Sequence, residues 1–148
     1  MSGARLLTLN AGSSTLKFAV YEAGPEPTLR LSGLVSNLDG APRLRAHVDG
    51  DVVAEQSWNG AIGLEAVLDR TFSWLEDAGW GEKLSAIGHR IVHGGLEHRE
   101  PVHLSAPVIR GLEALLPMAP LHQPFNLRGV AMAVERFPDT IQVGVFDT

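Results

Sequence analysis

The chain has 148 residues, of which 45% are hydrophobic and 20% charged, and its formal net charge is −5 with the histidines neutral. These values are ordinary for a soluble globular domain, and the acidic balance argues against a nucleic-acid-binding surface, which needs a basic patch. The absence of cysteine excludes disulfides and thiolate metal sites. The apolar run at residues 6–9 is interrupted by Asn10 and is too short for a signal sequence or a membrane span, so we expect a cytoplasmic protein.

Strand and turn patterns dominate the first third of the chain. Residues 6–9 lead into a turn, and the alternation at residues 16–20 predicts a second strand that pairs with the first as a hairpin. A third strand is predicted at residues 29–34. An Asp-Gly pair at residues 49–50 separates two further predicted strands, at residues 44–48 and 52–55, and this is a strong hairpin signal.

Helical spacing appears after residue 60. Apolar residues recur every three or four positions over residues 64–75 and predict an amphipathic helix that ends near Gly79. Two more helices are predicted, one capped by Ser105 and one over residues 126–137. Buried strands are predicted at residues 85–92 and 141–146. Antiparallel strands followed by alternating helix and strand predict an α/β protein, in which helices pack on a mixed β-sheet.

Asp147 directly follows the last predicted strand. Active sites of open α/β sheets lie beyond the carboxyl ends of their strands, so this carboxylate can bind Mg²⁺ or act on a nucleophile, although it can equally cap a following helix. A domain rarely ends at the tip of a buried strand, and we therefore expect the chain to be a piece of a longer protein. We also expect the apolar edge at residues 141–146 to be poorly covered.

The segment from Asn10 to Lys17 lies between two predicted strands and contains Gly12 with several hydroxyl residues. Backbone N–H groups, hydroxyls and a lysine can together hold phosphate oxygens, although the spacing is not that of a Walker A loop. A plain hairpin turn with a solvated lysine explains the segment equally well.

The segment at residues 88–95 ends a predicted strand and contains Arg90 between two histidines. The guanidinium offers a fork of donors that suits a carboxylate or a phosphate. His89 and His93 share a strand face and could bind a metal, but no third ligand has a recognisable spacing, and His89 also fits a structural hydrogen bond. A third segment places His122 between two prolines, either in a rigid functional loop or in a simple helix–helix linker.

Together these segments resemble the acetate kinase family. The likeness rests on four stretches that occur in the family's order and spacing, residues 7–17, 86–95, 119–124 and 145–148. It implies the fold shared by actin, sugar kinases and Hsp70 chaperones. In that fold two ribonuclease H-like domains, which arose by duplication, lie on either side of a cleft. Residues 1–148 would form the N-terminal domain, and the second domain would come from later sequence.

The resemblance also implies the residues on the phosphate side of the site. Asn10 would lie near the metal and the phosphoryl groups, and phosphate would be bound by Ser13, Thr15 and Lys17. Thr15 stands where serine is common, which keeps the hydroxyl.

On the acyl side, the resemblance implies that Arg90 binds the carboxylate and stabilises the transferred phosphoryl group. Val92 and Leu121 would line the acyl pocket, His122 would help to position the substrate, and Asp147 would orient the carboxylate or hold Mg²⁺. Gln123 stands where asparagine is common, which would alter only loop contacts.

The implied reaction is in-line phosphoryl transfer between ATP and acetate, with Mg²⁺, giving acetyl phosphate and ADP. The nucleotide-binding residues would lie in later sequence, so the isolated chain is expected to be inactive and the longer protein to be a homodimer. Propionate or butyrate kinase is the alternative within the class, because one methylene gives only about 1–3 kcal/mol of discrimination. A non-catalytic binding or regulatory module on the same fold is the alternative outside it.

Overall fold

The computed structural model of the chain describes residues 4–60, 62–92, 94–95, 98–118 and 120–146. Its strands, in chain order, are β1 (Arg5–Ala11), β2 (Leu16–Glu22), β3 (Thr28–Ser36), β4 (Arg43–Val48), β5 (Asp51–Ser57), β6 (Leu84–Ile91), β7 (Val102–His103) and β8 (Ile141–Phe146). Its helices are α1 (Leu64–Asp77), α2 (Ala106–Glu113) and α3 (Gln123–Arg136), with a 3₁₀ turn at Leu116–Met118. None of the helices in these ranges is both long and apolar enough to cross a membrane.

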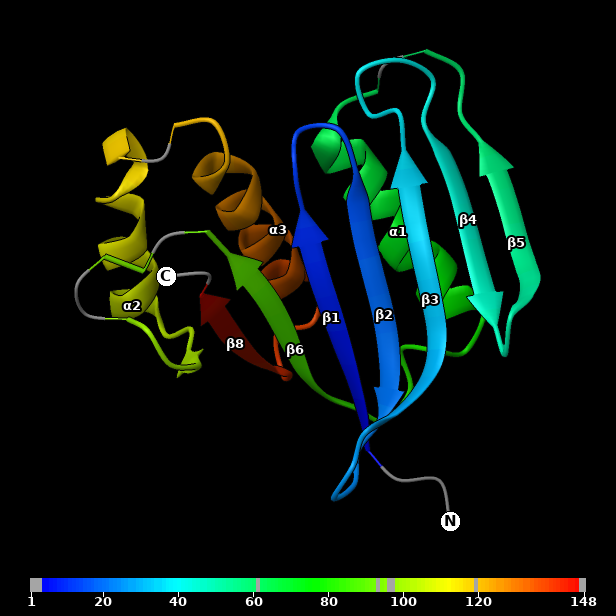
Figure 1. The fold of residues 1–148 in the computed structure, drawn as a ribbon, viewed down its shortest axis with the longest axis horizontal. Helices are drawn as coiled ribbons and strands as arrows, with labels where there is room; N and C mark the ends of the chain where they lie inside the picture. Colours follow the sequence, from blue (N-terminus) through cyan, green and yellow to red (C-terminus); the bar gives the residue numbers. More distant parts are fainter. Residues whose placement is uncertain (1–3, 61, 93, 96–97, 119, 147–148) are drawn as a thin grey trace.

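The strands of the described residues form one mixed sheet in the order β5-β4-β3-β2-β1-β6-β8-β7 (Figure 1). Strands β1 to β5 form an antiparallel meander, in which each strand pairs with the next along the chain. Strand β6 then joins β1 in parallel, and β8 joins β6 in parallel. The mixed sheet predicted from the element order is therefore confirmed.

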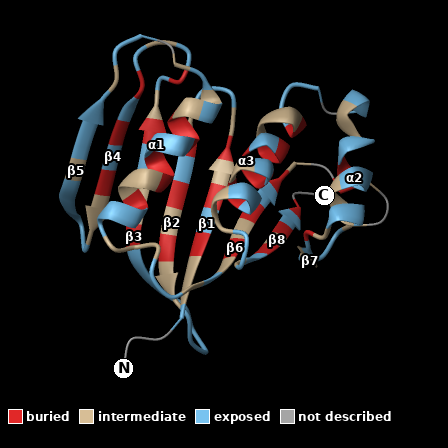
Figure 2. Cartoon of the chain, turned by 180° about the vertical axis from the view of Figure 1, so that it is seen from behind, coloured by how far each residue is buried: buried red, intermediate tan, exposed pale blue. Residues whose placement is uncertain are grey.

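The two faces of this sheet differ. Helices α1 and α3 lie against one face, which we call the covered face, and no described helix lies over the other, which we call the open face (Figures 1 and 2). Burial alternates along β1 and shows the difference between the two faces, because Leu7 and Leu9 are buried whereas Thr8 is exposed and Asn10 is half-buried. Successive side chains of a strand point to opposite faces, so each strand contributes one row of side chains to the core and one to the open face.

The core on the covered face has two parts. The larger joins strands β1 to β4 to α1, and its buried side chains include Leu16, Phe18, Leu68 and Phe72. The smaller lies where α2, α3 and β8 meet and consists of Ile91, Leu104, Leu112, Leu127, Val130 and Phe146. Most of these side chains lie in strands and helices that the sequence predicts, although Leu38 and Leu104 do not. Burying one such side chain contributes about 1.5–3 kcal/mol to the free energy of unfolding.

Local geometry agrees with the predicted turns and helix ends. Asp49 and Gly50 have φ angles of 52° and 85°, and the positive φ at both positions is what a tight two-residue hairpin requires. Gly79 has a φ of 86° just beyond α1, where a glycine commonly closes a helix.

Three details differ from the predictions. Helix α3 begins at Gln123 instead of residue 126, because Pro124 is tolerated in the first helical turn. Ser105 is the N-cap residue of α2, but its side chain makes no capping hydrogen bond. Strand β7 has only two residues and no predictive pattern, yet it pairs with β8, so β8 is not at the edge of the sheet. Ile141 and Val145 of β8 are nevertheless 55% and 46% exposed, in agreement with the poor cover expected there.

Candidate functional site

A groove on the open face contains several of the predicted site residues. It has a volume of about 430 Å³ and is lined by strands β1, β2, β6 and β8. Its lining residues are Thr8, Leu9, Asn10, Lys17, Phe18, Ala19, Gly88, His89, Arg90 and Val145. Asn10, Lys17 and Arg90, which were predicted from two separate segments of the sequence, thus meet in one hollow.

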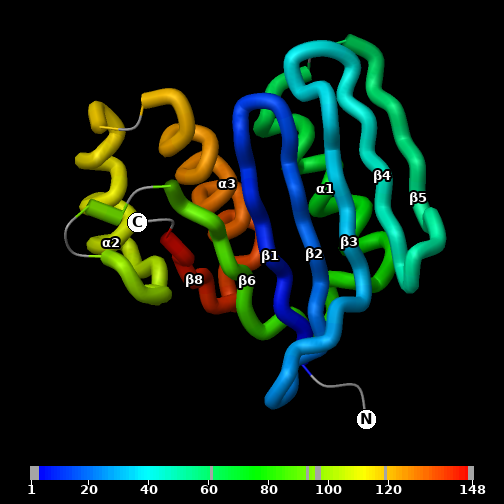
Figure 3. The backbone as a smooth tube through the Cα atoms, viewed as in Figure 1, coloured from blue at the N-terminus to red at the C-terminus, as the bar shows by residue number. Residues whose placement is uncertain are grey.

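Strand register explains why these side chains meet. Asn10 pairs directly with Lys17 across the β1–β2 hairpin, and Arg90 pairs with Val145 across β6 and β8. Strands β1 and β6 pair through Leu9 and His89, so Asn10 and Arg90 come next on both strands. Figure 3 shows β1 and β6 side by side although they are far apart in the chain. One row of side chains therefore crosses four neighbouring strands.

The charge of the groove favours an anion. Lys17 and Arg90 are both exposed, Asn10 between them is half-buried, and no carboxylate occurs among the described lining residues. An ammonium and a guanidinium donate charge-assisted hydrogen bonds to carboxylate or phosphate oxygens, and Val145 adds an apolar wall at the Arg90 end. The groove can therefore accommodate a small anion with an apolar tail.

The turn between β1 and β2 carries the predicted hydroxyls. Ser13 is exposed and Thr15 is half-buried, and neither is among the groove lining. The Gly12 N–H donates to the Thr15 carbonyl at 2.9 Å, which closes the turn. The turn joins Asn10 to Lys17 across the end of the hairpin, so a phosphate chain held in the groove would have to extend beyond it to reach these hydroxyls.

The residues predicted for the acyl side lie in different surroundings. Val92 is half-buried directly after β6, and its N–H donates to Asn126 Oδ1 at 3.0 Å. His122 is the N-cap residue of α3, and Leu121 before it is 73% exposed. Neither Leu121 nor His122 lines the groove. The carboxylate of Asp147 lies outside the described residues.

His89, which precedes Arg90, points to the covered face and has a structural role. Its side chain is 2% exposed, and its Nε2 lies 2.6 Å from Gln142 Oε1 on β8. Burial lowers the pKa of His89 from 6.5 to about 4, against the raising effect of that hydrogen bond, so the imidazole is neutral at pH 7 and donates from Nε2. The expectation of a structural hydrogen bond is confirmed, whereas His93, its predicted metal partner, lies outside the described residues.

Metal binding was predicted at Asn10 and Asp147. No group of three His, Asp or Glu side chains in the described ranges could hold a metal ion. Asn10 offers one neutral oxygen between Lys17 and Arg90, and no described carboxylate lines the groove beside it.

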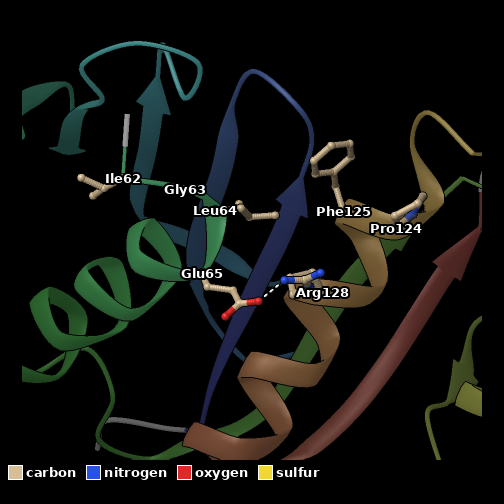
Figure 4. A pocket seen from close by; sticks show the side chains of 7 residues that line it. All are labelled: Ile62, Gly63, Leu64, Glu65, Pro124, Phe125 and Arg128. Carbon is tan, nitrogen blue, oxygen red and sulfur yellow. Dashed lines mark hydrogen bonds and ion pairs between the residues drawn. The ribbon is translucent and has the colours of Figure 1, made fainter. Parts of the chain in front are cut away.

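A second hollow, of about 410 Å³, lies between the N-terminal ends of α1 and α3 (Figure 4). Leu64 and Phe125 face it, and an ion pair between Glu65 and Arg128 spans it. It is similar in volume to the groove but belongs to the helices of the covered face. Its lining includes the carboxylate of Glu65, whereas no described carboxylate lines the groove, so the groove is the better candidate for anion binding.

Two residues of the site region were not predicted from the sequence. Val145 lines the groove because β8 presents it on the open face next to Arg90. Asn126 lies in α3 and accepts a hydrogen bond from the backbone N–H of Val92, directly after β6. The sequence offered one indication of this residue, a polar side chain at a helix position where the spacing predicts burial.

Comparison with known proteins gives consistent results. The model of the acetokinase family matches residues 5–148. The chain is 40% identical to the acetate kinase of Rhizobium meliloti over 147 residues, which is 97% of this chain and 37% of that protein. It superposes on the structure of the Porphyromonas gingivalis acetate kinase with a TM-score of 0.85 and 32% identity, covering 99% of this chain and 38% of that one. For the propionate kinase of Francisella tularensis the TM-score is 0.83 at 28% identity, with 97% of this chain and 37% of that one covered.

The chain thus spans less than two fifths of the length of these relatives. The likeness to the two solved structures, together with the mixed sheet, confirms the expected fold class of actin, sugar kinases and Hsp70 chaperones.

Proposed function

This chain belongs to the acetokinase family, and we propose that it supplies the acyl-phosphate half of the active site of an acetate kinase. The reaction is in-line transfer of a phosphoryl group between ATP and a carboxylate oxygen of acetate, giving ADP and acetyl phosphate. The observation that carries the proposal is the row of Lys17, Asn10, Arg90 and Val145, which lines one groove on the open face.

Arg90 is the residue to which we assign the largest catalytic contribution. Its guanidinium binds the carboxylate of acetate or the phosphoryl oxygens of acetyl phosphate, and it neutralises the charge that builds up on the transferred group. Asp147, which follows β8 in the sequence, orients the carboxylate of the substrate.

The remaining residues position the two ends of the substrate. Lys17, with the hydroxyls of Ser13 and Thr15, binds phosphate oxygens from the hairpin side. Asn10 would supply an oxygen ligand to Mg²⁺, and the bound ion would neutralise phosphate charge.

On the acyl side, Val92 and Leu121 line the pocket for the methyl group, and His122 helps to position the substrate. The exposure of Leu121 and His122 agrees with a site that is completed by another part of the protein.

We further propose that residues 1–148 form an N-terminal domain and that the nucleotide site comes from a second domain. The support is the share of the relatives that the chain covers, 37% for the Rhizobium meliloti protein. As the family resemblance implies, the complete protein would be a homodimer, and we propose that it is cytoplasmic.

A propionate kinase is the second candidate. It is supported by the TM-score of 0.83 to a solved propionate kinase and by Val145, whose side chain borders the groove next to Arg90. An acyl pocket distinguishes chains that differ by one methylene by only about 1–3 kcal/mol, so substrate preference needs a measurement.

The proposal is tested with a chimaera in which these 148 residues replace the matching part of the Rhizobium meliloti acetate kinase. We expect the chimaera to form acetyl phosphate from ATP and acetate, and the 148-residue chain alone to form none, because groups that act as a unit fail when half are missing. A folded chimaera that binds ATP but phosphorylates neither acetate nor propionate would contradict the proposal. Rates with acetate, propionate and butyrate give the acyl preference.

A further inference from the structure

Asn126 occupies an unusual position for an asparagine. It lies in the first turns of α3 and is 5% exposed, although asparagine is a poor helix former and a buried amide needs hydrogen-bond partners. Both partners are present. Asn126 Nδ2 donates to the Ala11 carbonyl at 2.7 Å, and Oδ1 accepts from the Val92 N–H at 3.0 Å. The two partners fix the orientation of the amide, because a flipped side chain would set donor against donor and acceptor against acceptor.

These two bonds join the ends of the strands that carry the groove. The parallel pairing of β1 with β6 runs as far as Leu9 and His89, whereas Ala11 and Val92 lie beyond it. Beyond that pair, the side-chain amide of Asn126 bridges the two strand ends as a backbone peptide group would. It therefore continues the hydrogen bonding past the last strand pair, where the backbone groups of Ala11 and Val92 would otherwise lose a buried partner.

Helix α3 approaches this point closely. Gly129, one turn after Asn126, faces Ala11, and a Cβ on Gly129 would lie 3.2 Å from the Ala11 Cβ. The missing side chain allows the helix to come near enough for the short amide of Asn126 to reach both strand ends.

We propose that Asn126 is a positioning residue that holds Asn10 and Arg90 at the separation needed to bind one anion between them. Asn10 immediately precedes Ala11, and Arg90 lies two residues before Val92. A change in the distance between the Ala11 carbonyl and the Val92 N–H would therefore move both side chains on the open face. The inference deepens the proposed function and rests on it, because Arg90 must be a working residue for its position to matter.

The first test is made on the 148-residue chain by nuclear magnetic resonance. In Asn126→Ala, we expect the Val92 amide to exchange with solvent at least about 100-fold faster, since a lost bond opens the strand end, and the Arg90 Nε–H resonance to shift. The matched control is Thr71→Ala, which removes a buried side-chain bond to the Val67 carbonyl inside α1 and leaves the strand ends alone. Unchanged protection of Val92, or an equal shift of Arg90 in the control, would overturn the proposal.

The second variant, Asn126→Asp, separates the two bonds and covers the case in which the alanine variant does not fold. The carboxylate still accepts from the Val92 N–H but cannot donate to the Ala11 carbonyl. We expect Val92 to stay protected while the Asn10 side-chain amide shifts. Loss of Val92 protection with no change at Asn10 would contradict the assignment.

Kinetics in the chimaera then separate this inference from the proposed function. Asn126→Ala should lower kcat about 100-fold and change KM less than about threefold, because misplacement by about 1 Å has that effect on a reacting geometry, while Thr71→Ala should stay within about twofold in both. If Arg90→Ala abolishes activity but Asn126→Ala does not, the positioning role is wrong and the proposed function stands. If Arg90→Ala itself has no effect, the proposed function fails.

Discussion

His89 and Arg90 are neighbours in one strand, and they show how differently the two faces of the sheet are used. His89 on the covered face is 2% exposed and hydrogen-bonded to Gln142, whereas Arg90 is exposed in the groove. Side chains on the covered face pack in the core, and the groove on the open face exposes polar groups to solvent. Substitutions on the open face should therefore change function with little change in stability, and those on the covered face the reverse.

The largest effect is expected from Arg90→Ala in the chimaera. Loss of a phosphoryl-clamping arginine should lower kcat about 1,000-fold, which is about 4 kcal/mol of transition-state stabilisation. The free energy of unfolding should change by less than about 0.5 kcal/mol, because the side chain is on the surface. Steady-state rates and urea unfolding measure the two quantities, and Arg90→Lys should restore little because a point charge lacks the guanidinium fork.

Acidification should act through the covered face. The pKa of His89 is about 4 in the folded chain and 6.5 in the unfolded chain, so between those values the unfolded state binds a proton that the folded state does not. The resulting stability loss begins near pH 6.5 and reaches about 3 kcal/mol near pH 4.

Urea unfolding of the 148-residue chain at pH 7.0 and pH 4.5 measures this loss. His89→Asn removes the titrating group and should reduce the difference between the two pH values. An equal loss in the variant would show that other groups cause it.

Paired valine truncations compare the two faces directly. Val20 on β2 is 1% exposed and belongs to the larger core, whereas Val145 on β8 is 46% exposed in the groove. We expect Val20→Ala to cost about 2 kcal/mol of unfolding free energy and Val145→Ala less than about 0.5 kcal/mol. Comparable losses in thermal or urea unfolding would mean that the open face carries packing energy as well.

The smallest predicted effect uses two helical glycines. A Cβ on Gly111 in α2 would meet nothing within 4 Å, so Gly111→Ala should stabilise the chain by about 0.5–1 kcal/mol through helix propensity. Gly129→Ala gains the same propensity but pushes α3 away from Ala11, so it should give no gain or a net loss. Equal stabilisation by both variants in urea unfolding would show that α3 can shift without cost.

Periodicity and turn chemistry predicted most of the fold. The helix over residues 64–75 and the strand over residues 141–146 follow from spacing, and the hairpin at residues 49–50 from an Asp-Gly pair. These signals are local, so a single sequence carries them. Strand β7 could not be predicted, because two residues have no period, and its place is set by its partner β8.

The site could be predicted in its parts, and its assembly needed the structure. Lys17 and Arg90 stood out because side chains suited to phosphate occurred near strand ends, whereas the role of Asn10 was implied only by the family resemblance. Val145 and Asn126 were not predicted, because an aliphatic residue in a strand and a polar residue in a helix do not indicate a function until their neighbours in space are known.

The strand order has a consequence for how the chain acquires its groove during synthesis. Strands β1 to β5 pair with their neighbours in sequence, and such local contacts close small loops and form early, whereas the junction of β1 with β6 closes a loop of more than half the chain. We therefore expect a nascent chain to pair Asn10 with Lys17 before it pairs β1 with β6. Because Asn126 bonds to both Ala11 and Val92, we expect the groove to reach its final width only after α3 has formed.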